Sequence, residues 1–408
     1  MARPDAEKFR PRILILIRYY LPGYRSGGPV RSLSNLVEAL GDEFDFRVIC
    51  LDHDVSERSS YAEIENEAWV PMGKAMVRYV KLSPLIPWRI KCAVNSLSPD
   101  LVYVNSFFDP MFAIFPLWLR RLRVITALPV LLAPRGEFSL GALSLQSTKK
   151  RAYLALATGL GGMQNLHWHA TTDSEREDIR RVLGDATKRI SVAANLGKLV
   201  TDQNLLPPRV SRGRLAVVYL SRITPKKNLL QAIRVVSASK SPLRFDIYGS
   251  VEDQDQDYWR KCQSAIAGCP RHVEIIYRGP VEHAKVHALL ADYDAFFLPT
   301  LGENFGHAIV EAMSVGLPVL ISDQTPWRGL QDLGVGYDLP LSDEKGFVEA
   351  LEELASRTPE QIERQREHVL RFVVKAVSGA EAICRTRAML LAAMGRSGST
   401  YEAQANPV

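Results

Sequence analysis

The most informative segment of this chain is Leu298-Pro-Thr-Leu-Gly-Glu-Asn-Phe-Gly-His-Ala-Ile-Val-Glu-Ala-Met313. The apolar residues Ala295 to Leu298 predict a strand, a glycine-containing loop follows, and a helix is expected to begin near Gly306. Repeated strand–helix units of this kind build parallel α/β sheets. Ligands bind such sheets at the carboxyl ends of the strands, so this loop is a candidate binding site.

Two glutamates give this segment its chemistry. Free N–H groups at the start of the predicted helix, together with the helix dipole, suit a sugar diphosphate. Glu303 lies in the loop, where its carboxylate could accept hydrogen bonds from sugar hydroxyls. Glu311 lies about two helical turns further on and could reach a ribose diol. Each glutamate alone would fit a helix-start acid or a surface residue, but the two together favour a binding site.

A second candidate segment is Tyr219-Leu-Ser-Arg-Ile-Thr-Pro-Lys-Lys-Asn-Leu229. A predicted strand ends at Leu220, and Arg222 and Lys227 follow it. Two cations at the carboxyl end of a strand suit a departing diphosphate. A solvated basic loop is the alternative interpretation, and Lys226 is the less specific of the two lysines.

The rest of the chain contains two series of alternating strands and helices, which predict an α/β fold with two Rossmann-like, doubly wound domains. The expected strands of the first series are residues 12–17, 46–51, 101–105, 124–127, 130–133, 167–171 and 190–193. Those of the second series are residues 215–220, 244–248, 273–277, 295–298 and 318–321. The predicted parts are an N-terminal domain (1–197), a polar linker (198–214), a C-terminal domain (215–375), a helix near 376–395 that packs back on the first domain, and a flexible tail (396–408).

The composition fits a soluble globular protein of two or three domains: 408 residues, 47% hydrophobic and 24% charged. The net charge of +6 is uneven, because residues 1–200 hold 27 Lys and Arg against 20 Asp and Glu. A basic N-terminal half predicts an acidic partner, such as an anionic membrane surface, a phosphorylated substrate or a nucleic acid. No apolar run approaches the ~18 residues of a membrane-spanning helix, and Ile13 to Ile17 is too short for a signal peptide, so a cytoplasmic protein is expected.

Several classes of protein lack their sequence motifs here. The absence of G-x-x-x-x-G-K-[ST] excludes a P-loop NTPase, and the absence of G-x-G-x-x-G argues against a dinucleotide dehydrogenase. The five cysteines do not have the spacing of a zinc site or a disulfide framework. Gly27 and Gly28, after the first strand, could let the backbone approach a ligand, although Gly-Gly-Pro is also a common turn.

These motifs resemble those of the retaining glycosyltransferases of family 4, also called group 1, which have the GT-B fold. The signature of that family is two glutamates separated by seven residues, here Glu303 and Glu311, and its phosphate clamp R-x4-K-[GN] is similar to Arg222…Lys227-Asn228. The resemblance is strongest over residues 215–335. Further matching segments are Ile247-Tyr-Gly249, Arg278-Gly-Pro-Val281 and Ala312-Met-Ser-Val-Gly-Leu-Pro-Val319, and residues 133–142 and 172–175 are similar to a bacterial polysaccharide-type subgroup.

The resemblance implies two domains that face each other across a central cleft, and it implies the site residues. Arg222, Lys227 and Glu303 would be catalytic, because the two cations would neutralise the departing nucleotide diphosphate and Glu303 would hold the donor sugar. Glu311 would hold the ribose. The other donor-binding positions would be Gly27, Gly28, Gly249, Pro280, Val281, Asn304, Phe305 and Gly306.

The chain departs from the family at one place. Many members carry a histidine after an N-domain strand, near the reacting centre, whereas the candidate positions here read Asn105-Ser106 and Pro134-Arg-Gly136. Asn105, Arg135 and Glu137 are therefore expected on the acceptor side. The histidines at 167, 169, 283 and 287 are interpreted as structural, and His307 as a local helix residue.

The implied reaction moves a sugar, with retention of its anomeric configuration, from a UDP- or GDP-type donor to a saccharide or lipid-linked saccharide acceptor in polysaccharide or cell-envelope synthesis. No metal or other cofactor is expected, since Arg222 and Lys227 would replace a divalent cation. The apolar run 111–119, followed by Arg120-Arg121, could contact an anionic membrane peripherally, at the inner face of the plasma membrane. It could equally be a buried helix with a basic end.

Two other classes of protein, another nucleotide-sugar enzyme and a nucleic-acid-binding protein, are alternatives to a transferase. Another GT-B nucleotide-sugar enzyme, such as an epimerase, would need no acceptor, but the spacing of the two glutamates favours a transferase. A nonenzymatic nucleic-acid-binding protein would fit the positive charge. Because the chain contains no recognisable nucleic-acid-binding module, no nucleic-acid partner is expected.

Overall fold

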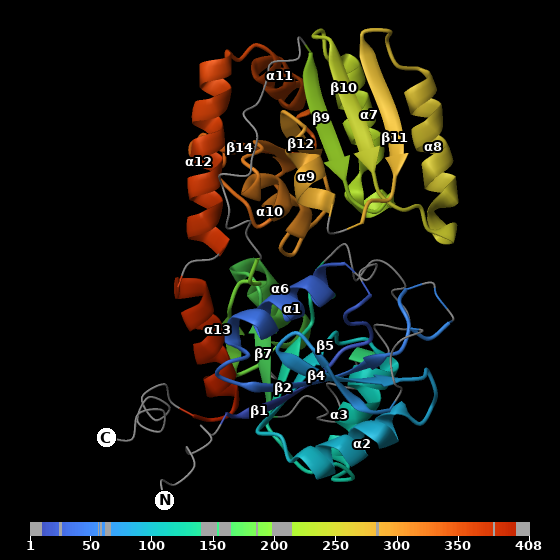
Figure 1. Ribbon diagram of the computed structural model, residues 1–408, viewed down its shortest axis with the longest axis vertical. Coiled ribbons are helices and arrows are strands. Elements are labelled where there is room, and N and C mark those ends of the chain that lie inside the picture. The colour runs from blue at the N-terminus through green and yellow to red at the C-terminus, as the bar shows by residue number, and fades with distance from the viewer. Residues whose placement is uncertain are drawn as a thin grey trace, which may run out of the picture. The chain divides into compact units, whose positions relative to one another are not determined.

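The computed structural model describes residues 10–23, 27–55, 57, 59–61, 67–139, 153–154, 165–184, 187–197, 214–282, 285–377 and 380–396. These residues form two compact units (Figure 1). The first contains the described residues up to Leu196 together with those from Ala380 onward, and the second covers residues 197–379. The predicted linker at 198–214 and the predicted tail at 396–408 lie almost entirely outside the described residues.

The first unit is built on an eight-stranded sheet in the order β3-β4-β2-β1-β5-β6-β7-β8. Its strands pair in parallel, except for the antiparallel pair of β3 and β4. Their bounds are β1 Arg12–Leu16, β2 Asp45–Leu51, β3 Trp69–Met72, β4 Ala75–Val80, β5 Leu101–Asn105, β6 Val130–Ala133, β7 Leu166–Ala170 and β8 Ile190–Val192.

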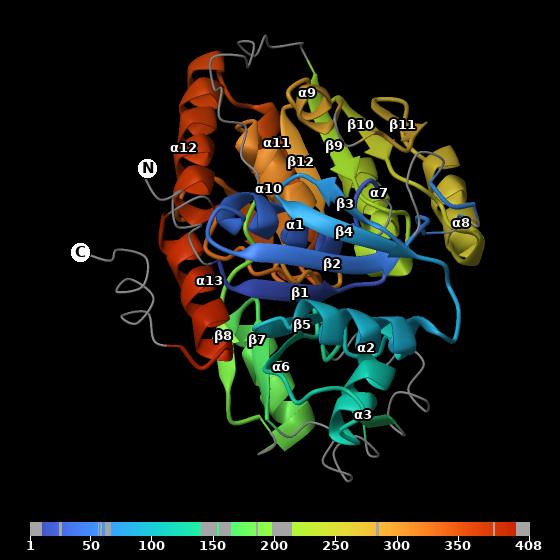
Figure 2. The ribbon, with the colours of Figure 1, turned by 60° about the horizontal axis from the view of Figure 1, so that its bottom comes forward.

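Helices cover both faces of this sheet (Figure 2). Alternate residues of β1 point to opposite faces: Leu14 and Leu16 pack in a core with α2 and α6, and Ile13 and Ile15 pack in a second core with α1 and α13. This double burial is what the continuous apolar run of the first strand predicts. The bounds are α1 Gly28–Leu40, α2 Ile86–Leu97, η1 Pro110–Ile114, α3 Phe115–Arg121, α6 Asp173–Leu183 and α13 Ala380–Ala393.

Two expectations for this sheet differ from the structure. The predicted strand at 124–127 is wrong, because the amides of Val124 and Ile125 donate to the carbonyl of Leu119 and close the end of α3. The hairpin of β3 and β4 was not predicted. Its first strand is four residues long and carries Pro71, which argues against a strand, and its second strand is interrupted by Arg78.

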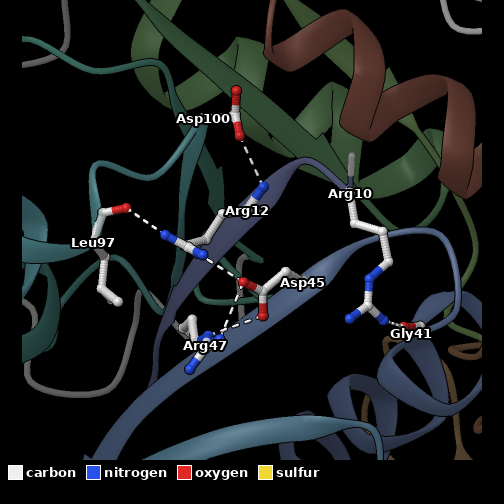
Figure 3. A network of polar contacts seen from close by, with 7 residues as sticks. All are labelled: Arg10, Arg12, Gly41, Asp45, Arg47, Leu97 and Asp100. Atoms are coloured by element: carbon white, nitrogen blue, oxygen red, sulfur yellow. Dashed lines mark hydrogen bonds and ion pairs between the residues drawn. The ribbon is translucent and has the colours of Figure 1, made fainter. Parts of the chain in front are cut away.

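A network of charged groups holds the amino-terminal end of the same sheet (Figure 3). The Asp45 carboxylate accepts hydrogen bonds from Arg12 Nε at 2.7 Å and from Arg47 Nε at 2.9 Å. The Asp100 carboxylate accepts one from the backbone amide of Arg12 at 2.8 Å, and Arg12 Nη1 donates to the carbonyl of Leu97. These contacts join the first residues of β1 and β2 to the residue that precedes β5.

The second unit is built on a six-stranded sheet, parallel throughout, in the order β11-β10-β9-β12-β13-β14. Its strands are β9 Leu215–Leu220, β10 Leu243–Tyr248, β11 Val273–Gly279, β12 Ala295–Leu298, β13 Val319–Ser322 and β14 Gly336–Leu339. Its α-helices are α7 Leu229–Ala238, α8 Gln256–Ala267, α9 Val286–Leu290, α10 His307–Ser314, α11 Glu344–Ala355 and α12 Pro359–Val377. The predicted α/β class with two parallel-sheet domains is confirmed, and only the short strand β14 was missed here.

Each sheet has one point where the order of its strands reverses. β1 lies between β2 and β5 in the first unit, and β9 lies between β10 and β12 in the second. Open α/β sheets bind their ligands at such switch points, outside the carboxyl ends of the strands. The loops after β1, β5, β9 and β12 are therefore the places where this fold positions a site.

Candidate functional site

The loops after β9 and β12 are tied together in the second unit. A 3-10 turn at Pro225–Lys227 follows β9, and its Lys226 carbonyl accepts hydrogen bonds from the amide of Leu301 at 2.8 Å and from Thr300 Oγ1 at 3.1 Å. The Thr300 carbonyl in turn accepts a hydrogen bond from Ser322 Oγ at 2.5 Å. Lys226, which the sequence marked as the less specific lysine, thus joins the two loops through its backbone.

Lys227 and Glu303 meet where these two loops touch. Their side chains form an ion pair, with 18% of the lysine side chain and 14% of the glutamate side chain exposed. The Glu303 amide donates to the Gln324 carbonyl at 3.0 Å, which fixes the backbone behind the carboxylate. The structure therefore brings together two of the three predicted catalytic residues.

Arg222, the third predicted catalytic residue, is exposed two residues after β9. Among the described residues it forms no ion pair. The predicted donor residue Gly249 sits behind this loop, because a Cβ built on Gly249 would lie 1.8 Å from the Ser221 carbonyl oxygen. Only glycine fits there, so the close approach of the two backbones explains the Ile247-Tyr-Gly249 motif.

Helix α10 begins beside Glu303. Gly306 precedes its first residue with φ of +77°, and a Cβ at Gly306 would lie 2.7 Å from Ile309 Cδ1. Trp327 Nε1 donates to the Phe305 carbonyl at 2.5 Å, and the two rings lie 5.8 Å apart. Trp327 is thus a packed aromatic that braces this loop.

Glu311 lies in the second turn of α10 and is 6% exposed. Asn304 occupies the loop before the helix and is half-buried. Helix α10 starts directly after this loop, and the amino end of a helix stabilises an anion.

The remaining predicted donor residues also follow strands. Pro280 is exposed and Val281 half-buried, directly after Gly279, the last residue of β11, whose φ is +78°. In the first unit Gly27 has φ of +77° and precedes Gly28, the first residue of α1. All of these residues lie after strands, and their contact with a donor stays a prediction.

A cluster centred on Arg135 occupies the carboxyl end of the first sheet. Arg135 Nε and Nη2 donate to Asn105 Oδ1 at 3.1 and 2.8 Å, and Nη2 also donates to the Tyr103 hydroxyl at 2.9 Å. Arg135 Nη1 donates to Asn195 Oδ1 at 2.5 Å. The predicted neighbours Asn105 and Arg135 are therefore brought together, whereas Tyr103 and Asn195 were missed.

Glu137, the third predicted acceptor-side residue, braces the loop after β5. Its carboxylate accepts hydrogen bonds from Ser106 Oγ at 2.7 Å and from the amides of Phe107 and Phe108 at 2.5 and 3.2 Å. Ser106 has φ of +90°, in the left-handed region that non-glycine residues rarely adopt. The hydrogen bonds to the Glu137 carboxylate offset the free-energy cost of this backbone conformation and fix the end of β5.

His169 extends the Arg135 cluster into the core. Its Nδ1 lies 2.6 Å from the Tyr103 hydroxyl and its Nε2 lies 2.8 Å from the Ala193 carbonyl. Burial lowers the pKa of His169 to about 3, and the neighbouring Arg135 contributes to the shift. His169 is therefore neutral at physiological pH and serves as a structural link. His167 also makes a structural contact, with Ser191 Oγ. His283 lies outside the described residues.

The described residues contain neither a cluster of metal ligands nor a helix that could span a membrane. No group of three or more histidine, cysteine, aspartate or glutamate side chains there could hold a metal ion. None of the helices described is both long enough and apolar enough to cross a membrane.

Residues 208–368 match the model of the family described as glycosyl transferases group 1. Among curated proteins, the phosphatidyl-myo-inositol mannosyltransferase of Mycobacterium leprae is 28% identical over 232 residues, or 53% of this chain and 56% of that protein. The protein of that name from Mycolicibacterium smegmatis is 29% identical over 187 residues, or 45% of this chain and 46% of that protein. The chain thus spans about half the length of the curated relatives it matches.

Solved structures match over nearly the whole chain. Sucrose-phosphate synthase from Thermosynechococcus elongatus has a TM-score of 0.67 and 16% identity, and the match covers 94% of this chain and 98% of that one. Anabaena HepE in complex with UDP-glucose has a TM-score of 0.66 and 16% identity, with 93% and 98% covered. These matches show the fold, and together with the family match they confirm the predicted resemblance to group 1 glycosyltransferases of the GT-B fold.

Proposed function

We propose that this chain, whose second domain matches the group 1 glycosyltransferases, transfers a sugar from a nucleotide diphosphate to an acceptor hydroxyl. The observation that carries the proposal is the ion pair of Lys227 and Glu303 at the switch point between β9 and β12. A cation beside a carboxylate can receive both parts of a sugar diphosphate, since the cation suits the phosphate and the carboxylate suits the sugar hydroxyls.

The proposed mechanism depends on the charge that develops during the reaction. As the bond between the anomeric carbon and the diphosphate oxygen breaks, negative charge grows on the phosphate, and Arg222, Lys227 and the amino end of α10 stabilise it. The acceptor oxygen forms the new bond on the same face of the sugar, so the configuration is retained. The acceptor proton passes to the departing phosphate. Glu303 orients the sugar and Glu311 holds the ribose, and no metal takes part.

The proposed donor is a UDP- or GDP-sugar, and the proposed acceptor is a saccharide or lipid-linked saccharide of polysaccharide or envelope synthesis. HepE, which shares the fold, was solved with UDP-glucose. The mycobacterial relatives are named as mannosyltransferases of a phosphatidylinositol lipid. These names support a nucleotide-sugar donor and a lipid-bearing acceptor.

Nucleotide binding without metal tests the proposal first. UDP, GDP, ADP and CMP are added separately to the wild type and to Arg222→Ala, and thermal unfolding is followed. One nucleotide at about 100 times its Kd should stabilise the wild type by about 2–3 kcal/mol, and the variant much less at the same concentration. No shift with any nucleotide would overturn the diphosphate site. Release of free nucleotide and an isomerised sugar without acceptor would instead indicate the epimerase alternative.

We further propose peripheral membrane contact through an α2–α3 surface on the first domain. Helices α2 and α3 contact each other, and both views show them side by side (Figures 1 and 2). Residues 81–99 and 110–136 contain no aspartate or glutamate. The exposed members of the surface are the apolar Leu82, Leu85, Trp88, Phe115, Leu122 and Val124 and the basic Lys81, Arg121 and Arg123.

The exposed groups of the α2–α3 surface suit an anionic bilayer. Leu85 and Leu122 are 62% and 67% exposed, and Lys91 Nζ lies 4.1 Å from the centroid of the Trp88 ring. Aromatic and apolar side chains enter the interface while the cations bind anionic headgroups. Within the run 111–119, Phe112 and Leu117 are buried in the domain, so Phe115 is the residue of that run that would enter the bilayer interface.

Vesicle co-sedimentation tests this contact. The wild type should sediment with phosphatidylglycerol vesicles and remain in solution with phosphatidylcholine vesicles. The double substitution Leu85→Ser and Arg121→Gln should abolish sedimentation, whereas Arg180→Gln, at an exposed arginine of α6, should not. Equal sedimentation of all three proteins, or none, would refute the α2–α3 surface.

A further inference from the structure

The hydrogen bonds around Arg135 have a single possible direction. His169 is neutral, and because a carbonyl can only accept, its Nε2 carries the proton and donates to Ala193. The His169 Nδ1 is then an acceptor, so the Tyr103 hydroxyl donates to it. The Tyr103 oxygen in turn accepts from Arg135 Nη2. Each hydrogen bond in this series is donated in the same direction, from the guanidinium to Tyr103, from Tyr103 to His169 and from His169 to the core.

Neutral groups alone hold the Arg135 cation. Its acceptors are Tyr103, Asn105 and Asn195, and no carboxylate among the described residues forms an ion pair with it. The nearest carboxylates are engaged elsewhere, since Glu137 binds the loop after β5 and Glu175 accepts from the Gly136 amide at 2.6 Å. The guanidinium is therefore fixed in position without an ion pair to any described carboxylate.

Two hydrogen-bond donors of this cluster have no acceptor among the described residues. A guanidinium has five N–H groups. The bonds above use Nε, both hydrogens of Nη2 and one of Nη1, so a second Nη1 hydrogen has no acceptor among the described residues. Asn195 turns its Oδ1 to the same Nη1, and its amide Nδ2 donates to no described residue.

We propose that Arg135 and Asn195 form an oxyanion-binding site at the carboxyl end of the first sheet, for a phosphate or carboxylate group. The cation supplies the charge and one N–H, and the amide of Asn195 supplies a second donor, an arrangement that suits an oxygen-bearing anion. Asn105 and Tyr103 are positioning residues, because they accept three of the other four N–H groups. His169 is also a positioning residue, because it accepts from the Tyr103 hydroxyl and thereby holds it in place.

The anion is carried by a substrate of the reaction proposed above, and to this extent the site rests on the proposed function. Two substrates can supply the oxyanion. A phosphorylated or acidic acceptor carries one, and so does the diphosphate of the donor. Both present the same chemistry to Arg135, and binding measurements distinguish them.

The test measures binding by calorimetry to the full chain, without any transfer reaction. Wild type, Arg135→Gln, Asn195→Ala and Tyr103→Phe are titrated with glucose 1-phosphate, with glucose as the uncharged control, and with UDP and GDP. Glucose 1-phosphate should bind the wild type and bind Arg135→Gln about 10- to 100-fold more weakly. Arg135→Lys, which keeps the charge and loses the planar fork, should bind with intermediate affinity.

The control is Arg180→Gln, which removes one positive charge from an exposed position of α6 in the same domain. It should bind glucose 1-phosphate as the wild type does. Tyr103→Phe should weaken binding by a smaller factor than Arg135→Gln, and far-UV circular dichroism should show that each variant is folded.

The outcomes separate this site from the donor site. If Arg135→Gln weakens only glucose 1-phosphate, the oxyanion belongs to the acceptor, and if it weakens only the nucleotides, it belongs to the donor. If folded Arg135→Gln binds every ligand as the wild type does, the oxyanion site is refuted while the donor site stands. If no nucleotide binds the wild type but glucose 1-phosphate does so through Arg135, the transferase proposal fails and the oxyanion site stands.

Discussion

Arginines of the eight-stranded sheet differ in whether a carboxylate holds them, and at the carboxyl-terminal end Arg18 pairs with Asp109 at 2.6 Å whereas Arg135 does not have such a partner among the described residues. At the amino-terminal end Arg12 and Arg47 share the carboxylate of Asp45. At the carboxyl-terminal end, the hydrogen-bond acceptors of the Arg135 guanidinium among the described residues are a hydroxyl and two amide oxygens. Both sets of contacts are short and well directed, so the difference lies in the charge that remains after the contacts are made.

This difference separates two uses of a cation. An arginine paired with a carboxylate within the protein stabilises the fold and has little attraction left for a ligand anion. An arginine held by neutral acceptors lowers the free energy of unfolding, because the guanidinium loses part of its hydration and gains no ion pair with an opposite charge. Parallel sheets bind ligands at the carboxyl end, which is where the uncompensated cation lies. The comparison predicts that a cation without a carboxylate partner at a carboxyl end serves binding, and that a cation paired with a carboxylate serves stability.

Arg222 extends the comparison to the second domain and should show the largest effect. It follows β9, is exposed, and has no ion pair among the described residues. Arg222→Ala should lower kcat/KM by about 100- to 1000-fold, because the charge on the departing phosphate is less well stabilised. Its free energy of unfolding should change by less than about 0.5 kcal/mol.

Steady-state kinetics and urea unfolding measure the two quantities for Arg222→Ala. Arg234→Ala, at an exposed position of α7 in the same domain, is the matched control and should leave both unchanged. A variant of Arg222 that is strongly destabilised yet fully active would break the comparison.

Lys227 combines both uses, because it lies after β9 and is paired with Glu303. Lys227→Met leaves the largely buried Glu303 carboxylate without its cation and should destabilise the protein by about 1–3 kcal/mol. Adding Glu303→Gln should restore most of that stability, while transferase activity stays low in both variants. Urea unfolding with parallel activity assays follows both, and a double variant that recovers activity together with stability would assign this pair to the fold alone.

Asp45 tests the amino-terminal end. Asp45→Asn leaves Arg12 and Arg47 without a shared carboxylate and should lower the free energy of unfolding by about 1–2 kcal/mol, with nucleotide affinity unchanged. Asp42→Asn removes a carboxylate that is 78% exposed and paired with Lys74, so it should cost less than about 0.5 kcal/mol. Chemical denaturation and calorimetry provide the measurements, and a loss of nucleotide affinity in Asp45→Asn would contradict the division between the two ends.

The smallest effect is a dependence on pH. Burial raises the pKa of Asp45, but hydrogen bonds from Arg47 and Arg12 outweigh burial and hold the pKa below its ordinary value. The stabilisation is therefore complete above the unfolded pKa of about 3.9 and is lost as the pH falls through the lower folded value. The stability difference between the wild type and Asp45→Asn should shrink as the pH falls below about 4, measured by denaturation at constant ionic strength. A difference that does not change with pH would show that the charge of Asp45 is not what stabilises this end.

Local patterns predicted much of this protein. Continuous apolar runs predicted the strands of both sheets other than β3, β4 and β14, because strands buried on both faces need no alternation. The spacing of Glu303 and Glu311 marked the loop before α10. The same local logic failed for β3, which is partly exposed, and for 124–127, where bonds to Leu119 end a helix.

The partners of Arg135 could not be read from the sequence. Tyr103 lies 32 residues before it, in a strand, and Asn195 lies 60 residues after it, in a loop. Neither residue has a distinctive neighbour in the chain. Only the strand order, which places β5, β6, β7 and β8 next to one another, brings these side chains together.

Helix α13 has a consequence for the order in which the protein can fold during translation. Its residues Met389, Leu390 and Leu391 belong to the core that also contains α1 and β1, and Arg387 pairs with Glu43 at 2.5 Å. The ribosome synthesises this helix after the whole second domain. The core of the first unit can thus be completed only after the second unit has been made, and the nascent chain must protect that unfilled apolar face until α13 has emerged.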